Sequence, residues 1–108
     1  MAIKWTDGNY NMAILEIDTA ITHGVKTKIG TVADYKRLRK LSENAGIFRV
    51  TAKIDGETMA GACNANIFSA GIDFGCVTNF GGSAHAISGT IEVDTADMYV
   101  TINVTAIS

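Results

Sequence analysis

The chain has 108 residues, of which 47% are hydrophobic and 19% charged, and its formal net charge is −2 at pH 7. These values fit one packed domain spanning residues 1–108; they exclude a disordered chain and disfavour a nucleic-acid binder, which usually carries a basic excess. The sequence has neither an apolar run that spans a bilayer nor a signal-peptide core, so we expect a cytoplasmic protein, free or assembled in a particle, without membrane contact.

The first element is a predicted N-terminal hairpin. Asp7-Gly8 favours a two-residue turn because both central residues of a type I′ turn need positive φ. Such a turn places Trp5 opposite Tyr10 and Ile3 opposite Met12.

The next segment is less regular. Apolar residues at 14–17 break strict alternation, which indicates a bulge or a strand buried on both faces. His23-Gly24 then predicts a turn before a strand at 25–29.

One helix is predicted at about 32–45. Thr31 is its expected N-cap, Asp34 completes an acidic variant of the capping box, and Gly46 is the expected stop. The apolar stripe that would face the core comprises Val32, Tyr35, Leu38, Leu41 and Ala45.

A basic cluster covers much of the remaining helix surface. It consists of Lys36, Arg37, Arg39 and Lys40. A solvated helix face is the interpretation that the slightly acidic chain favours, and an anion-binding patch is the alternative.

Residues 47–107 predict a five-stranded antiparallel meander. Its turns fall at Asp55-Gly56, 68–71, Gly81-Gly82 and 94–97. Every one of these turns keeps the apolar positions on the same face, whereas a one-residue slip would move them all to the other face.

The meander also predicts specific cross-strand pairs. They are Val50 with Gly61, Ala65 with Phe74, Ile72 with Ile91, Gly89 with Ile102, Cys63 with Cys76 and Gly61 with Thr78. Gly61 and Gly89 therefore fall on the inner face, where a missing side chain makes room for a neighbour or lets the sheet bend.

The outer face of the meander is small and mostly uncharged. An ordinary solvated sheet is one interpretation, and contact with another subunit is the other, because few charges oppose association. The candidate interface residues are Thr58, Ala60, Thr101, Asn103 and Thr105.

The fold class is therefore mainly β with one helix. Five strands make a sheet about 24 Å wide, and one helix covers about 10 Å of it. We expect the N-terminal strands to complete a sandwich or barrel, with a partner subunit contributing further cover.

The two cysteines are predicted to face each other. Cross-strand neighbours lie within disulfide range, but a chain without a secretion signal is expected to keep Cys63 and Cys76 reduced. Adding His23 and His85 gives a spacing that matches no compact zinc module, so we expect neither a metal nor a cofactor.

Three hypotheses about function remain. The first is a non-enzymatic structural or interaction protein that forms homo-oligomers. The second is a small-ligand-binding domain with a pocket on the inner face around Trp5, Phe74, His85 and Tyr99. The third is a small enzyme that uses His85 or a carboxylate such as Asp73, although Ser83 and His85 have no acid at a comparable position.

The predicted architecture, an antiparallel sandwich with a lone helix, is similar in style to small β-rich components of phage particles, such as tube, decoration and fibre proteins. This resemblance implies a structural role and assigns no site residue.

Overall fold

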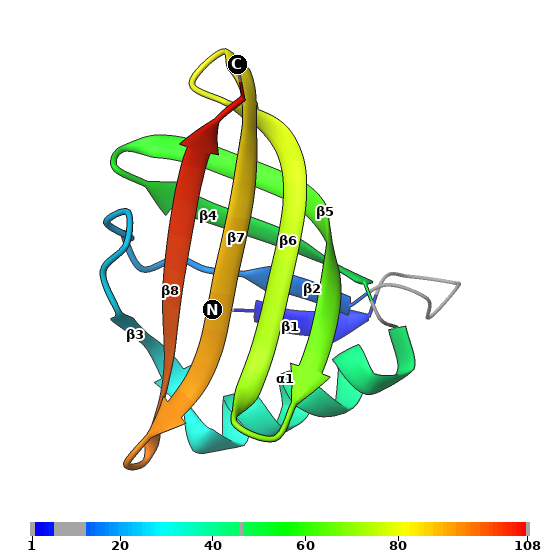
Figure 1. Ribbon diagram of the computed structural model, residues 1–108. Helices are drawn as coiled ribbons and strands as arrows, with labels where there is room; N and C mark the ends of the chain where they lie inside the picture. The colour runs from blue at the N-terminus through cyan, green and yellow to red at the C-terminus, as the bar shows by residue number, and fades with distance from the viewer. Residues whose placement is uncertain (1, 6–12, 46, 108) are drawn as a thin grey trace.

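The computed structural model describes residues 2–5, 13–45 and 47–107 of the chain. The fold is mainly β with one helix, as the sequence predicts (Figure 1). The elements are β1 (Ala2–Trp5), β2 (Ala13–Glu16), β3 (Thr27–Thr31), α1 (Val32–Ala45), β4 (Ile47–Ile54), β5 (Glu57–Phe68), β6 (Gly71–Phe80), β7 (Ser83–Asp94) and β8 (Asp97–Ala106).

The eight strands form one curled sheet in the order β1-β2-β4-β5-β6-β7-β8-β3. Neighbouring strands are antiparallel except for β2 and β4, which are parallel. The curl places β6, β7 and β8 across β1, β2 and β4 as two crossing layers, and α1 lies at one end in contact with strands of both (Figure 1). The meander is thus completed by N-terminal strands added at both of its edges.

Turn geometry predicted most of the meander correctly. Val50 pairs with Gly61 and Ile72 with Ile91. Asp55 and Gly56 both have positive φ, at 50° and 84°, as a type I′ turn requires. The loops at 68–71 and 94–97 are tighter than predicted, because their first and last residues also pair.

The ladder between β5 and β6 corrects one prediction. It ends at the pair Asn64 and Gly75, so Cys63 with Cys76 and Gly61 with Thr78 are not ladder pairs. The reason is that β5 serves both layers: its first part pairs with β4, and its last part pairs with β6. The strand turns the corner between the layers where the two parts meet.

The N-terminal hairpin corrects a second prediction. Trp5 pairs with Ala13 and Ile3 with Leu15, so the register with Tyr10 and Met12 is wrong. Parallel pairing with β4 and the complete burial of Ala13 and Leu15 decide where β2 lies. The predicted turn at 7–8 lies outside the described residues.

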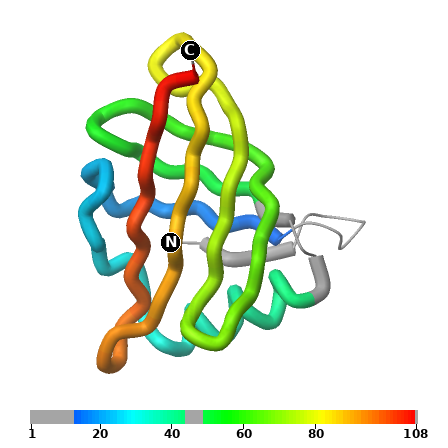
Figure 2. Tube along the Cα trace, viewed as in Figure 1, coloured from blue at the N-terminus to red at the C-terminus, as the bar shows by residue number. Residues whose placement is uncertain are grey.

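Residues 22–26, here called the strap, connect the two layers. The predicted turn is present, with Gly24 at φ 74°, and the Gly24 amide donates to the Ile102 carbonyl of β8 at 2.8 Å. The strand that follows is β3, two residues later than predicted, and it pairs with β8. Figure 2 shows this segment as the light-blue trace that reaches the outer edge of β8.

The helix begins where the sequence predicts. The Thr31 amide donates to the Asp34 carboxylate at 2.9 Å, and the Asp34 amide donates to Thr31 Oγ1 at 3.3 Å, which is the predicted capping box. Leu38 is fully buried against the sheet. Gly46 lies outside the described residues. Within the described chain, no helix combines the length and apolar character needed to cross a bilayer.

The interior of the curled sheet is filled by one apolar cluster. Its largest fully buried members include Leu15, Leu38, Ile54, Met59, Ile72 and Ile102. Phe74 lies in this cluster with its ring against Gly89 of the next strand. The inner face therefore serves packing, and the sites with accessible polar groups lie on the outside.

Candidate functional site

The outward side chains of β6, β7 and β8 form a regular surface, here called the β6–β8 face. It follows from alternation, because every second residue of each strand points away from the core. Three of its rows, each crossing all three strands, are Asp73-Thr90-Thr101, Gly75-Ser88-Asn103 and Val77-Ala86-Thr105. A fourth row begins with Asn79 and Ala84.

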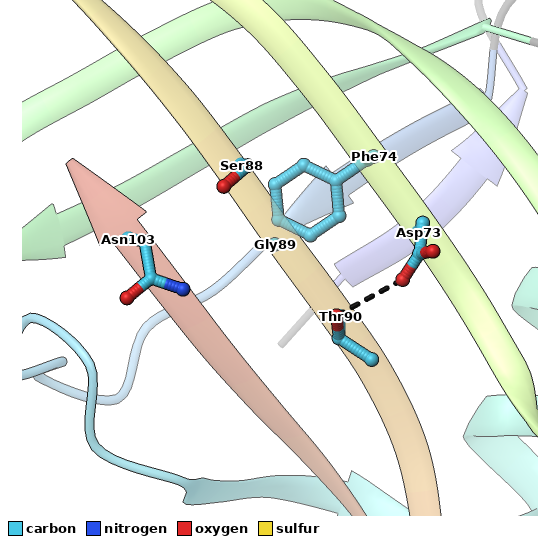
Figure 3. Close-up of a pocket in the computed structure, with 6 residues that line it drawn as sticks. All are labelled: Asp73, Phe74, Ser88, Gly89, Thr90 and Asn103. Atoms are coloured by element: carbon cyan, nitrogen blue, oxygen red, sulfur yellow. Dashed lines mark hydrogen bonds between the residues drawn. The ribbon is translucent and has the colours of Figure 1, made fainter. Parts of the chain in front are cut away.

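Ionised groups lie at one end of the β6–β8 face. Asp73 is in the first row, and its carboxylate accepts a hydrogen bond from Thr90 Oγ1 at 2.9 Å (Figure 3). Among the described residues of the other three rows, no side chain is ionisable. Most of the face is therefore both small and uncharged.

Lys26 of the strap neutralises the acids just beyond the first row. Its ammonium lies 3.0 Å from Asp94 and 3.6 Å from Glu92, and 5.0 Å from the centre of the Tyr99 ring. The hydrogen bond and charge of Lys26 hold the pKa of Asp94 below its usual value, and the same bond raises the pKa of Lys26. Lys26 of the strap therefore forms ion pairs with Glu92 and Asp94 at the acidic end of the face.

Val77 is the most exposed large apolar side chain of the described residues. It is 65% exposed and lies between Gly75 and Asn79 on β6. A single exposed apolar residue is ordinary, but here its neighbours across the sheet are Ala86 and Thr105. Another surface could approach it closely.

A hollow of about 280 Å3 opens in the first two rows of the face, next to the row of Val77. Asp73, Ser88, Thr90 and Asn103 line it, with Phe74 and Gly89 below (Figure 3). Ser88 and Thr90 are short side chains, which leaves room for the hollow between Asp73 and Asn103. It is a concave polar feature of the face.

The predicted interface residues divide between two surfaces. Thr101, Asn103 and Thr105 belong to the β6–β8 face. Thr58 and Ala60 are exposed on the first part of β5, which pairs with β4 in the other layer. Val77 was missed, although the alternation of β6 would have identified it.

Three of the four residues of the predicted inner-face pocket, Phe74, His85 and Tyr99, lie apart. Phe74 is buried in the core, and Tyr99 lies on the outer face beneath Lys26. His85 is half-buried, with its ring edge-on to Phe80 at 5.5 Å. Trp5 belongs to β1, and its side chain lies outside the described part of the chain.

The residues of the enzyme hypothesis are also apart. His85 faces inward opposite Thr78, with Nδ1 2.9 Å from the Ser83 carbonyl, whereas Asp73 faces outward and binds Thr90. Within the described residues, no three His, Cys, Asp or Glu side chains gather in a metal-binding cluster.

The basic cluster of α1 is divided by its contacts. Arg39 donates to the Phe68 carbonyl at 2.9 Å and to the Tyr35 hydroxyl at 3.0 Å, and its Nε lies 3.6 Å from Glu43. Arg39 therefore attaches the β5–β6 hairpin to the helix. The other three residues of the cluster are exposed: Lys36, Arg37 and Lys40.

Chemically, the β6–β8 face offers short hydroxyl, amide and methyl groups on a regular backbone. Such groups suit contact with another surface. The acid of the face, Asp73, accepts a hydrogen bond from Thr90. Comparison with protein-family models, curated proteins and solved structures found no significant match to this chain.

Proposed function

We propose that this protein is a non-enzymatic structural or interaction protein that associates with copies of itself through the β6–β8 face. The observation that carries the proposal is the row Val77-Ala86-Thr105, in which a side chain that is 65% exposed stands among small uncharged neighbours. An uncharged surface loses little hydration when it is covered, and small side chains let two sheets approach to about 10 Å.

A second copy is the partner that the charges favour. The acids of the face gather at one end, around Asp73 and Glu92. A two-fold axis that lies in the interface at right angles to the strands places the acidic end of one copy over the uncharged end of the other, near Asn79 and Ala84. This arrangement keeps the acidic ends of the two copies apart.

The area of the β6–β8 face sets the expected strength of association between two copies. Four rows on three strands cover roughly 20 by 14 Å, or about 300 Å2. A standard interface buries about 800 Å2 on each partner, so a single contact of this size gives weak association that depends on concentration.

The solution mass measured by light scattering over a range of concentrations tests the proposal. We expect a mass above 11.4 kDa that falls on dilution and is insensitive to salt. Val77→Lys should give a monomer at every concentration, since it places a charge in the contact. The control Ala60→Lys, on the exposed face of β5, should associate like the wild type.

Two results would overturn this function. One is a wild-type monomer at the highest concentration reached. The other is equal dissociation of Ala60→Lys and Val77→Lys, which would move the contact away from the β6–β8 face.

The hollow favours a second candidate, binding of a small polar ligand. Asp73, Thr90 and Asn103 offer an acid, a hydroxyl and an amide around one opening. A screen of small polyols and amides by NMR should then shift the amide signals of Ser88 and Thr90. Signals that stay in place with every compound would remove this candidate.

A further inference from the structure

The two cysteines face each other at the point where β5 and β6 part. Asn64 and Gly75 form the last ladder pair on one side of them. On the other side, Thr78 Oγ1 of β6 donates to the Ala60 carbonyl of β5 at 3.1 Å. The strands are therefore held together on both sides of Cys63 and Cys76, although they exchange no ladder bond there.

Both sulfur atoms lie against the same glycine. Cys63 Sγ is 3.8 Å from the Gly61 carbonyl oxygen. A Cβ built on Gly61 would lie 3.3 Å from Cys76 Sγ. Since Gly61 has no side chain to separate them, the two thiols share one small space on the inner face.

The two thiols differ in accessibility. Cys63 is completely buried, whereas Cys76 is half-buried, and both are free cysteines. Burial, together with the neighbouring Cys76 thiol, raises the pKa of Cys63. Cys63 is consequently the slower nucleophile, and Cys76 is the thiol that a reagent in solution meets first.

We propose that Cys63 and Cys76 form an oxidisable pair that closes into an intramolecular disulfide when it meets a small disulfide oxidant. Disulfides accept Cα separations of about 4.4 to 6.8 Å, a range that begins at the spacing of a close antiparallel pair and extends beyond it, so strands that have begun to part can still be bridged.

The exchange takes place in two steps. The Cys76 thiolate attacks one sulfur of the oxidant, and its S–S bond breaks to release one small thiol. Cys63 then loses its proton and attacks Cys76 Sγ, which forms the protein disulfide and releases the second small thiol. Two protein thiols are oxidised, and one small disulfide is reduced to two thiols.

The burial difference predicts the order of events. The first step is fast and the second is slow, because the Cys63 thiol must deprotonate inside the core. A mixed disulfide on Cys76 should therefore rise and then decay. The product fastens β5 to β6 where the sheet turns the corner between its layers.

The test is treatment of dilute native protein with oxidised glutathione, followed by acid quenching and intact-mass measurement. We expect a glutathione adduct that decays into a monomer lighter by two hydrogen atoms, with both thiols lost to alkylation. Cys63→Ala should retain the adduct on Cys76 permanently, and Cys76→Ala should react several-fold more slowly than the wild type.

Two outcomes in the wild type would overturn the proposal: an adduct on Cys76 that never resolves, or disulfide-linked dimers as the main product. Both are measured on the unmodified chain, so they remain decisive even where a cysteine variant fails to fold. Dilution keeps the result independent of self-association.

Discussion

Strand β6 pairs differently with its two neighbours, and each boundary between β6 and a neighbouring strand is here called a seam. Toward β7 the ladder runs along the whole strand, from Ile72 with Ile91 to Phe80 with Ser83. Toward β5 it stops halfway, at Asn64 with Gly75. The first seam makes the front layer a flat, continuous surface, and the second lets the sheet bend out of that layer. One strand thus supplies both the flat face and the corner.

The inner-face glycine at each seam shows the same contrast. A Cβ on Gly89 would lie 2.1 Å from the Phe74 ring, so that space is fully occupied. A Cβ on Gly61 would lie 3.3 Å from Cys76 Sγ and 3.4 Å from Thr78, so it would fit only if these neighbours moved by a few tenths of an ångström. The continuous seam is therefore packed more tightly than the parted seam.

Breaking the tight seam should have the largest effect. Gly89→Ala should lower the free energy of unfolding by about 3 kcal/mol, because overpacking a core displaces side chains and backbone. Phe74 is 3% exposed and surrounded by the core, so it cannot move aside without cost. Urea unfolding of the variant and the wild type measures the difference.

Gly75→Ala is the matched control, since a Cβ there meets the Ile87 carbonyl at an ordinary 3.6 Å. The double variant Gly89→Ala, Phe74→Leu should be less destabilised than the sum of its single changes, because the clash is then relieved. A Gly89→Ala protein as stable as the wild type would contradict the packing described for this seam.

The hydrogen bond that spans the parted seam should contribute less. Thr78→Val keeps the shape of the side chain but removes the donor to the Ala60 carbonyl, and should cost about 1 kcal/mol. Thr58→Val, an exposed threonine on β5, is the control and should change stability very little. Equal losses in the two variants would show that the bond does not hold the seam.

Among the core variants, Gly61→Ala, at the parted seam between β5 and β6, should change stability least. Gly61→Ala requires Cys76 to shift by a few tenths of an ångström, but it also restricts the unfolded chain, which favours folding by about 0.4–1 kcal/mol. We expect a net change within about 0.5 kcal/mol of zero. A loss as large as that of Gly89→Ala would remove the distinction between the seams.

The smallest effect is expected outside both seams, at the exposed pair Lys26 and Asp94. The pKa of Asp94 is held below its ordinary value of 3.8 by Lys26. The carboxylate therefore stabilises the fold above that pH, and the contribution is lost as the pH falls through the lowered value. The stability difference between wild type and Asp94→Asn should disappear in acid and shrink in high salt, whereas a pH-independent difference would contradict this origin.

The contrast between seams also explains what the sequence could predict. Asp55-Gly56 and Gly81-Gly82 fix their hairpins by local chemistry, so pairs such as Val50 with Gly61 follow from counting. The end of the β5–β6 ladder does not follow, because it depends on β5 turning toward β4 in the other layer.

The same distinction holds elsewhere in the molecule. The capping pair Thr31 and Asp34 is local and was predicted, whereas the register of β2 depends on its distant parallel partner β4 and was not. For the candidate face, the alternation of inward and outward residues predicted that Thr101 and Asn103 point outward. The same alternation places Val77 on this face, although Val77 was missed. The hollow depends on how Phe74 packs beneath Gly89, which no local pattern reveals.

The strap has a consequence for aggregation. An open strand edge is a template on which other chains can add, and proline, which commonly blocks such edges, is absent from this sequence. Here β3 pairs with the first half of β8. Beyond it, the Gly24 amide donates a hydrogen bond to the Ile102 carbonyl, and His23 Nδ1 accepts a hydrogen bond from the Val104 amide at 2.9 Å. An imidazole without a proton on Nδ1 thus stands in for a neighbouring backbone carbonyl. The strap and β3 thereby cover the outer edge of β8 as far as Val104, and the outermost strand on this side is β3, which has only five residues.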